Sequence, residues 1–242
     1  MSVEKPLYII PARGGSKGIP RKNIKPLGGR PLLDYAARGA FEALGPDADR
    51  RRVVLSTEDE EIASVGRACG LDVWYMRPES LAGDTVGSRE VILDVMDKAD
   101  AIGLEYDAVV LLQPTSPFRA VGDILGAQAL YDPESTDMVV SVCESGANPY
   151  YNLFETSQDG TLHVCKGSGL ITRRQEAPKV WEYNGAVYVI RPESLRAMPM
   201  GDFPRRLPYE MPALRSVDLD TPLDWAVAEA LIANGAFDAD QQ

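Results

Sequence analysis

The segment RGGSKGIPRKN at residues 13–23 combines glycines with four closely spaced cations. Glycines allow backbone N–H groups to approach an anion, and positive charge comes from Arg13, Lys17, Arg21 and Lys22; together these features suit a polyphosphate. The segment lacks the Gly-Lys-Ser/Thr of a P-loop, and it matches the GxGxxG dinucleotide pattern poorly. A solvated basic loop is the alternative, which is disfavoured because the rest of the chain is acidic.

A pair of aspartates in VDLDTPLD, at residues 217–224, forms the second candidate site. Asp218 and Asp220 alternate along a predicted strand, so we expect both carboxylates to face the same side. Proteins usually hold Mg²⁺ with one or two carboxylates plus substrate phosphates, which this pair could supply. A two-histidine metal site is excluded because His163 is the single histidine. The sequence alone leaves open that Asp220 only caps the following helix, as Asp224 does.

Two further polar segments could contact a substrate. Gln113 ends an apolar run in QPTSPFR and could hydrogen-bond a base or a sugar, although the two prolines also suit a stiff structural turn. The segment RPESLAGDTVGS places Arg77, Asp84 and Ser88 in a loop that is too long for a simple connection.

The segments RRQEAPK and WEYNGAVY form the last candidate. Arg173, Arg174 and Lys179 could hold an anionic substrate, and the Asn184-Gly185 pair allows close backbone approach. Pairs of arginines are also common on solvated surfaces, and the sequence by itself favours that interpretation.

The composition restricts the class of protein. The 242 residues include 36 acidic and 25 basic side chains, for a net charge of −11, so we expect neither a general nucleic-acid binder nor an anionic-membrane binder. Cys69, Cys143 and Cys165 lack a CxxC spacing and are odd in number, which indicates a reducing compartment. The N-terminus lacks a secretory signal and no apolar stretch could span a bilayer, so we expect a cytoplasmic protein.

These polar residues follow apolar segments that alternate with helical patterns. Short apolar runs predict strands buried on both faces, and apolar spacing of three to four residues predicts helices. The expected strands are residues 7–12, 51–57, 71–76, 108–113, 138–144, 181–190 and 214–220. The expected helices are residues 31–44, 59–70 (opened by a Thr57–Glu60 capping box), 90–103, 121–132 and 221–236 (with Thr221 as N-cap).

This alternation predicts an α/β protein with a mainly parallel, doubly wound sheet. Residues 145–180 break the pattern and indicate an insertion or small β subdomain within a single domain of residues 1–242. In such sheets ligands bind at the carboxyl ends of the strands. The unusual residues follow those ends: 13–23, Ser56, Thr57, 77–88, 113–119, Asp218 and Asp220.

The sequence IPARGGSKGIPRKNIKPLGGRPLL closely resembles the N-terminal signature of the acylneuraminate cytidylyltransferases, the CMP-sialic acid synthetase family. The resemblance continues through VVLSTEDEEIA, RPESLAGDTVGS, VVLLQPTSPFR, NGAVYVI and VDLDTPLD, in the right order over nearly the whole chain. It implies a Rossmann-like, three-layer nucleotide-diphospho-sugar transferase fold with a small dimerisation insertion.

The resemblance implies that CTP and a nine-carbon 2-keto sugar acid give a CMP-sugar and pyrophosphate, with Mg²⁺ as cofactor. The C2 hydroxyl of the sugar would attack the α-phosphorus of CTP, a reaction that needs in-line positioning and charge neutralisation more than covalent help. Lys17, Lys22 and Asp220 are the implied catalytic residues, and Asp218 with Asp220 would bind the metal.

By the same resemblance, the remaining positions divide between nucleotide and sugar. The nucleotide positions are Arg13, Gly14, Ser16, Lys17, Lys22, Asn23, Arg77 and Ser88. The sugar positions are Gln113, Arg174 and Asn184, of which Arg174 would pair with the sugar carboxylate.

The resemblance also implies a homodimer in which residues 145–180 form an arm over the partner's site, so that Arg174 would serve the neighbouring subunit. Glu182 and Tyr183, just before Asn184, are closer to the legionaminate-type pattern than to the sialate-type pattern. Legionaminic or pseudaminic acid is therefore an alternative to N-acetylneuraminic acid. A Kdo cytidylyltransferase, a sugar-1-phosphate nucleotidyltransferase and a non-catalytic nucleotide-binding module are the more distant alternatives.

Overall fold

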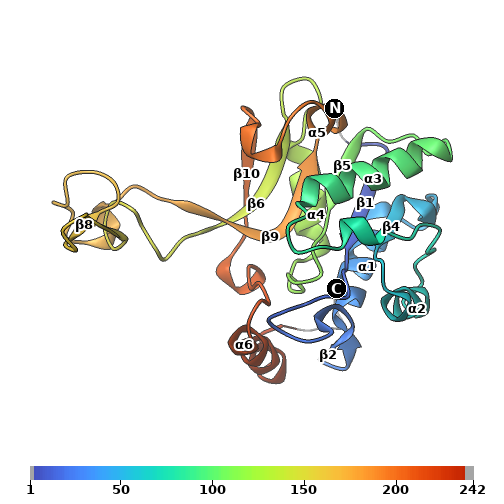
Figure 1. The fold of residues 1–242 in the computed structure, drawn as a ribbon, viewed down its shortest axis with the longest axis horizontal. Helices are drawn as coiled ribbons and strands as arrows, with labels where there is room; N and C mark the ends of the chain where they lie inside the picture. The colour runs from blue at the N-terminus through green and yellow to red at the C-terminus, as the bar shows by residue number, and fades with distance from the viewer. Residues whose placement is uncertain (1–2, 238–242) are drawn as a thin grey trace.

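The computed structural model describes residues 3–237, so the ends of the predicted domain of residues 1–242 lie outside the described part. A six-stranded sheet forms its centre, with strand order β10-β6-β9-β5-β1-β4 (Figure 1). The strands are β1 (Pro6–Pro11), β4 (Val53–Ser56), β5 (Ala108–Leu111), β6 (Met138–Glu144), β9 (Trp181–Ile190) and β10 (Arg206–Glu210). All neighbours are parallel except β9, which runs antiparallel to both β5 and β6. The predicted mainly parallel α/β fold is confirmed.

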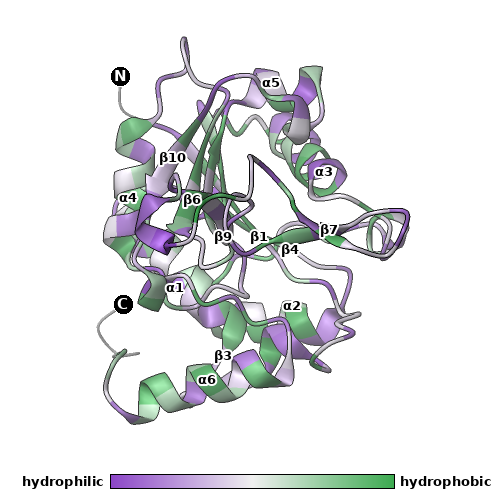
Figure 2. Cartoon of the chain, turned by 90° about the vertical axis from the view of Figure 1, so that its left-hand side faces the viewer, coloured by the Kyte–Doolittle hydropathy of each residue, from purple (hydrophilic) through white to green (hydrophobic). Residues whose placement is uncertain are grey.

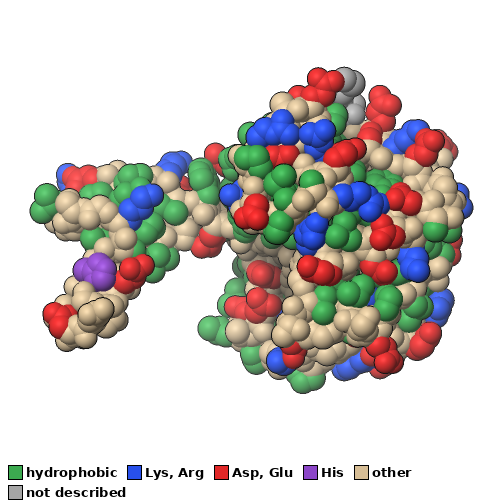
Figure 3. Space-filling view, turned by 45° about the horizontal axis from the view of Figure 1, so that its top comes forward, with side chains coloured by type: hydrophobic (Ala, Val, Ile, Leu, Met, Phe, Trp, Pro, Cys, Tyr) green, Lys and Arg blue, Asp and Glu red, His purple; other side chains and the backbone are tan. Residues whose placement is uncertain are grey.

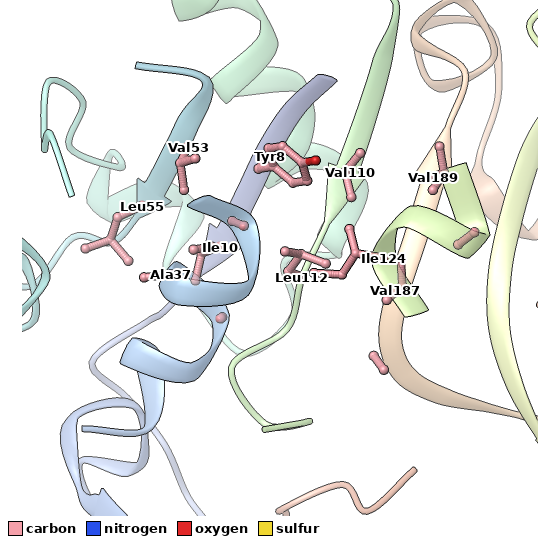
Figure 4. Close-up of a cluster of buried hydrophobic side chains, with 14 of the residues drawn as sticks. Tyr8, Ile10, Ala37, Val53, Leu55, Val110, Leu112, Ile124, Val187 and Val189 are labelled. Atoms are coloured by element: carbon pink, nitrogen blue, oxygen red, sulfur yellow. The ribbon is translucent and has the colours of Figure 1, made fainter. Parts of the chain in front are cut away.

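Helices cover both faces of the sheet, and the side chains of β1 show why. Tyr8 and Ile10 point into one cluster with α1 (Leu32–Leu44), α2 (Glu60–Ala68) and α4 (Val121–Leu130), shown in Figure 4. Leu7 and Ile9 point into the opposite cluster, with α3 (Ser88–Ala101) and α5 (Pro192–Ala197). Since alternate strand residues face opposite layers, a strand buried on both faces is a continuous apolar run.

A smaller hydrophobic cluster fixes the C-terminal helix α6 (Pro222–Ala233) to the segment after β1. Trp225 of α6 and Leu219 before it pack with Ile19, next to the short antiparallel pair β2 (Pro26–Leu27) and β3 (Arg30–Pro31). Thr221 and Asp224 form the capping box at the start of α6, which confirms the predicted N-cap. This cluster brings residues from both ends of the sequence together.

Residues 145–180 project from the body as a thin arm (Figure 1). Its regular structure is the antiparallel pair β7 (Phe154–Thr156) and β8 (Leu162–Val164). The arm exposes large hydrophobic side chains, and in Figure 3 such side chains lie along its surface. They are Leu153, Phe154, Leu162 and Leu170.

Three predictions of local structure are wrong. Residues 71–76 form no strand, although Leu71 and Tyr75 are buried. These residues pack their apolar side chains beside the edge strand β4 but form no ladder of backbone hydrogen bonds with it. The apolar pattern therefore indicates burial, not strand pairing. The helix α2 begins after Asp59, which accepts from the N–H groups of Glu61 and Ile62, and not at a Thr57–Glu60 capping box.

The predicted last strand, residues 214–220, is also absent, because a 3₁₀ turn over Ala213–Arg215 is followed by irregular chain. The sheet instead ends with β10, which pairs with β6. β10 is a largely exposed edge strand that contains Pro208, so it lacks the apolar pattern from which strands are predicted.

Hydropathy follows the layers, since green colour concentrates in the central strands of Figure 2. Within residues 3–237, no helix combines the length and the hydrophobicity that crossing a bilayer requires.

Candidate active site

A cavity of about 400 Å³ opens where the loops that follow β1 and β5 face the loop before α3. This volume is in the range of small-molecule sites, and its place is the carboxyl edge of parallel strands. Most of the site residues expected from the sequence line it: Arg13, Ser16, Lys17, Lys22, Asn23, Arg77, Ser88, Gln113 and Asp220.

Two close contacts shape the loop after β1, one at a glycine and one at a side-chain amide. A Cβ on Gly18 would lie 2.2 Å from the carbonyl oxygen of Asp220, so only glycine lets this loop pass beside the C-terminal segment. The Asn23 amide donates to the carbonyl of Arg13 at 3.0 Å and closes the loop on itself. The loop is therefore held in one shape by its own amide and by the segment before α6.

The loop cations have different partners. Lys22 Nζ donates to the carbonyl of Leu219 at 2.7 Å and to Asp220 Oδ1 at 2.9 Å. Arg21 turns away from the cavity to Asp59 and Glu61, and its backbone has a φ of 55°. Of the cations in the motif, Arg21 thus stabilises the loop from behind, while Lys22 faces the cavity.

Arg77 is a buried cation at the floor of the site. Its side chain donates to Ser56 Oγ at 3.0 Å and to the Ser56 carbonyl at 2.7 Å, at the end of β4. Burial lowers the pKa of Arg77, and the Glu58 carboxylate, 3.9 Å away, opposes that shift. The same carboxylate accepts from the N–H of Gly14 at 2.7 Å, so Glu58 joins the floor to the glycine loop.

Arg119 anchors the turn that contains Gln113. This fully buried guanidinium donates from Nη1 and Nη2 to the Gln113 carbonyl, at 2.9 and 2.7 Å, and from Nη1 to the Ala186 carbonyl at 3.0 Å. The N–H of Leu219 donates to the carbonyl of Thr115 at 2.9 Å, which joins the same turn to the aspartate segment. The position of the aspartates thus depends on the turn.

Asp218 and Asp220 differ in environment, and the strand on which both were expected to face the same side is absent. Asp220 is exposed and paired with Lys22, whereas Asp218 is largely buried and its Oδ1 has no hydrogen-bond partner among residues 3–237. Burial, followed by the charge of Asp220, raises the pKa of Asp218, while a hydrogen bond from Thr115 and the charge of Lys22 oppose the shift.

An unpartnered buried carboxylate oxygen beside an exposed carboxylate fits a hard cation. Among residues 3–237 no three His, Cys, Asp or Glu side chains form a metal-ligand cluster. The remaining ligands of an Mg²⁺ ion would therefore come from a substrate or from water, as is usual for this ion.

Four expected site residues do not line this cavity, and one of them is Asp218. Gly14 lies just behind it, with its N–H on Glu58. Asn184 is buried in the β9 bulge, where it accepts from Ser141 Oγ at 2.6 Å and donates to Ser216 Oγ at 2.9 Å. Arg174 lines a second cavity of about 400 Å³ at the base of the arm.

Gly185, next to Asn184, has a φ of 72°, and a Cβ there would lie 3.2 Å from Ser116 Oγ and 3.5 Å from Asp218 Oδ2. The Asn-Gly pair predicted to permit close backbone approach does so toward the turn and Asp218. Asn184 itself hydrogen-bonds to Ser141 and Ser216 inside the sheet.

The structure adds residues to the site that the motifs alone did not distinguish. Ser56 ends β4 and was visible only as a residue at a strand end, where its contact with Arg77 now gives it a role. Glu58 follows in an ordinary STEDE sequence, so only its contact with Arg77 reveals it. Arg119 closes QPTSPFR, where its position after a strand end was the single available signal. Asp84 was visible as one polar residue of a long loop, and the structure places it on two of the cations.

The cytidylyltransferase family model matches residues 7–174, which include every loop of the cavity except the segment before α6. The chain belongs to the cytidylyltransferase family. Members of this family are nucleotidyltransferases, which agrees with a cavity that combines cations and carboxylates.

Two curated relatives align over most of the chain. The CMP-N,N'-diacetyllegionaminic acid synthase of Legionella pneumophila is 30% identical, over 93% of this chain and 95% of its own length. The N-acylneuraminate cytidylyltransferase of Streptococcus agalactiae serotype V is 31% identical over 91% of this chain, which corresponds to 52% of that longer protein. Among solved structures, a CMP:2-keto-3-deoxy-manno-octonic acid synthetase in complex with CTP has a TM-score of 0.66 at 20% identity, over 96% of this chain and 100% of that one. This likeness confirms the cytidylyltransferase fold.

Proposed function

We propose that this cytidylyltransferase joins CMP, from CTP, to the C2 hydroxyl of a nine-carbon 2-keto sugar acid and releases pyrophosphate. The observation that carries the proposal is one cavity lined by Arg13, Lys17 and Lys22 together with Asp220, which is paired with Lys22. The cations suit a triphosphate, and the carboxylates suit the cation that accompanies it.

In this reaction the C2 oxygen forms a bond to the α-phosphorus, the bond from that phosphorus to the β-phosphate oxygen breaks, and the hydroxyl proton is lost. Arg13, Lys17 and Lys22 neutralise the charge that develops on the leaving pyrophosphate. Arg77, Asn23 and Ser88 line the same cavity and position the nucleotide. Pre-arranged groups of this kind lower the barrier because they need little reorganisation during the reaction.

Asp218 and Asp220 are the residues that would hold Mg²⁺. When bound, the ion supplies neutralisation and orientation of phosphate oxygens. Lys22 links its ammonium to Asp220 at 2.9 Å, so the same lysine contacts both the metal-binding segment and the phosphate side of the cavity. This contact offers a direct route from metal binding to phosphate positioning.

For the sugar, we propose a legionaminate-type nonulosonic acid. Two observations support this choice: Glu182 and Tyr183 precede Asn184, and the relative from Legionella carries the name of a legionaminic acid synthase. Tyr183 is half-exposed, and Glu182 accepts from Ser145 Oγ at 2.7 Å, at the base of the arm. A sugar side chain that extends toward the arm could meet these two residues.

The direct test is pyrophosphate release from CTP and Mg²⁺ with N-acetylneuraminate, a legionaminate, a pseudaminate and Kdo, with mass detection of products. We expect a CMP-legionaminate. Preference for N-acetylneuraminate or pseudaminate would correct the sugar, and turnover with Kdo alone would contradict a nine-carbon substrate. CTP binding without turnover for any sugar acid would favour a non-catalytic nucleotide-binding module.

We further propose a homodimer in which the arm of one subunit completes the site of the other. The arm exposes four large hydrophobic side chains, and Arg174 lines a cavity separate from the one that holds the loop cations. A closed two-fold pair would cover the exposed hydrophobic residues on both subunits at once. Sedimentation should show a dimer, and a monomer with full activity would refute the proposal.

Coexpression of differently tagged Arg174→Ala and Asp220→Asn chains tests whether Arg174 acts in trans. In a mixed dimer, one site then combines an intact cavity with an intact arm, which should restore about a quarter of the wild-type activity across a random mixture. The assay holds the sugar well below its KM, where both single variants turn over slowly. If Arg174 acts within its own chain, no site is intact and the mixture shows no gain over the single variants.

A further inference from the structure

Asp84 bridges two cations of the loop after β1 from the opposite side of the cavity. Its Oδ1 lies 2.9 Å from Arg13 Nη1, and its Oδ2 lies 2.5 Å from Lys17 Nζ. All three residues line the cavity. One carboxylate therefore uses both of its oxygens on the cations that the proposed reaction assigns to phosphate.

This arrangement makes phosphate binding an exchange of anions. A triphosphate held by Arg13 and Lys17 carries several negative charges, and a carboxylate on the same donors would repel it. Arg13, Lys17 and Asp84 are each more than a third exposed at the side chain, so their ion pairs are weak enough to be replaced. Asp84 stands between Gly83 and Gly87 in an irregular loop, which leaves it room to withdraw.

We propose that Asp84 is a displaceable counter-ion: it competes with polyphosphate for Arg13 and Lys17 and leaves them when CTP or pyrophosphate binds. This inference rests on the proposed function, because it takes the nucleotide triphosphate as the ligand of the cavity. Its consequence is selectivity, since a ligand gains from the two cations only if its charge exceeds that of the carboxylate it replaces. It also assists release of pyrophosphate, because the carboxylate returns to the cations as the product leaves.

The test compares Asp84→Asn with wild type by calorimetric titration of CTP, pyrophosphate and cytidine in buffer with a chelator. The amide keeps the size of the side chain and removes its charge. We expect CTP and pyrophosphate to bind about three- to tenfold more tightly, the range for the loss of two competing exposed ion pairs. Cytidine should bind unchanged, because it carries no phosphate. Pyrophosphate should also become a stronger product inhibitor by the same factor.

Glu79→Gln is the matched control, since it removes the same charge from an exposed position of the same loop outside the cavity lining. It should leave the affinities for CTP and pyrophosphate unchanged, and an equal gain in both variants would refute a specific role for Asp84. Asp84→Ser is a second variant with the same expected gain, in case the asparagine side chain disturbs the loop.

Three further results would overturn the proposal. Unchanged or weaker pyrophosphate binding by both Asp84 variants would show that the carboxylate does not compete. A parallel change in cytidine binding would show a rearranged loop instead of anion exchange. Weaker CTP binding in the presence of Mg²⁺ would identify Asp84 as a metal ligand. If wild-type protein bound neither CTP nor pyrophosphate, the proposed function would fail first, which is a distinguishable outcome.

Discussion

Replacement of Arg119 by Met should destabilise the protein strongly, because the arginine side chain donates hydrogen bonds to backbone carbonyls in the interior. The guanidinium donates twice to Gln113 O and once to Ala186 O. Methionine fills a similar volume but donates nothing, so both carbonyls lose a charged donor. At about 1–3 kcal/mol for each of the two buried acceptors left without a partner, the free energy of unfolding should fall by roughly 2–6 kcal/mol.

Urea unfolding followed by tryptophan fluorescence measures this change, and the midpoint should move while the slope stays constant. In thermal unfolding, the same loss corresponds to roughly 10 °C for a chain of this size. Arg67→Met is the control, because Arg67 is exposed on α2 and its closest ion-pair distance, to Glu60, is 3.8 Å. We expect that control to change the free energy of unfolding by less than about 0.5 kcal/mol.

Activity should fall together with stability in Arg119→Met, since the anchored turn carries Gln113 and holds the Asp218–Asp220 segment through Thr115. A conservative Arg119→Lys should recover part of the stability, because lysine keeps the charge but lacks the planar fork of guanidinium donors. A loss below about 1 kcal/mol in the methionine variant would show that the buried hydrogen bonds contribute little, and it would refute the reasoning.

Three other predictions concern charged residues of the two cavities and the neighbouring Asp218. Asp220→Asn should lose most turnover and keep CTP binding in calorimetry, because it removes a metal ligand and not the loop cations; near-normal turnover would contradict this role. Arg174→Ala should mainly raise the KM for the sugar, and an equal rise in the KM for CTP would argue against sugar recognition. Asp218→Asn should raise the unfolding midpoint at pH 8, since the raised pKa of Asp218 means that folding disfavours its charged form. That gain should vanish in acid, where Asp218 takes a proton in both states; a pH-independent difference would rule out the electrostatic cause.

Several parts of the fold were predictable because a strand buried on both faces appears in the sequence as a continuous apolar run. The apolar runs of residues 138–144 and 181–190 coincide with β6 and β9 over their full lengths. The strand ends also located the cavity, since parallel strands bring their carboxyl ends to one edge. The failures have the same origin: residues 71–76 are buried without pairing, and β10 pairs without burial.

The candidate site divides in a similar way. The types of its residues, a cationic glycine loop and two aspartates, were evident from motif and spacing, and most of them line one cavity. Asn184 and Arg174 could not be placed by motif, because a side chain beside a bulge can point into the sheet and an arm can carry its residues away from the body.

By itself, the sequence determined which segments are buried and which residue types gather at the edge of the sheet, because hydrophobic periodicity and local charge are properties of neighbours along the chain. Only the tertiary structure decided which charges meet. Lys22 pairs with Asp220 from 198 positions away, and Arg13 pairs with Asp84 from 71 positions away. Such contacts depend on how the helices and the sheet pack together. The strength of an electrostatic interaction is set by the distance between the two charges in space, and their separation along the sequence does not determine it.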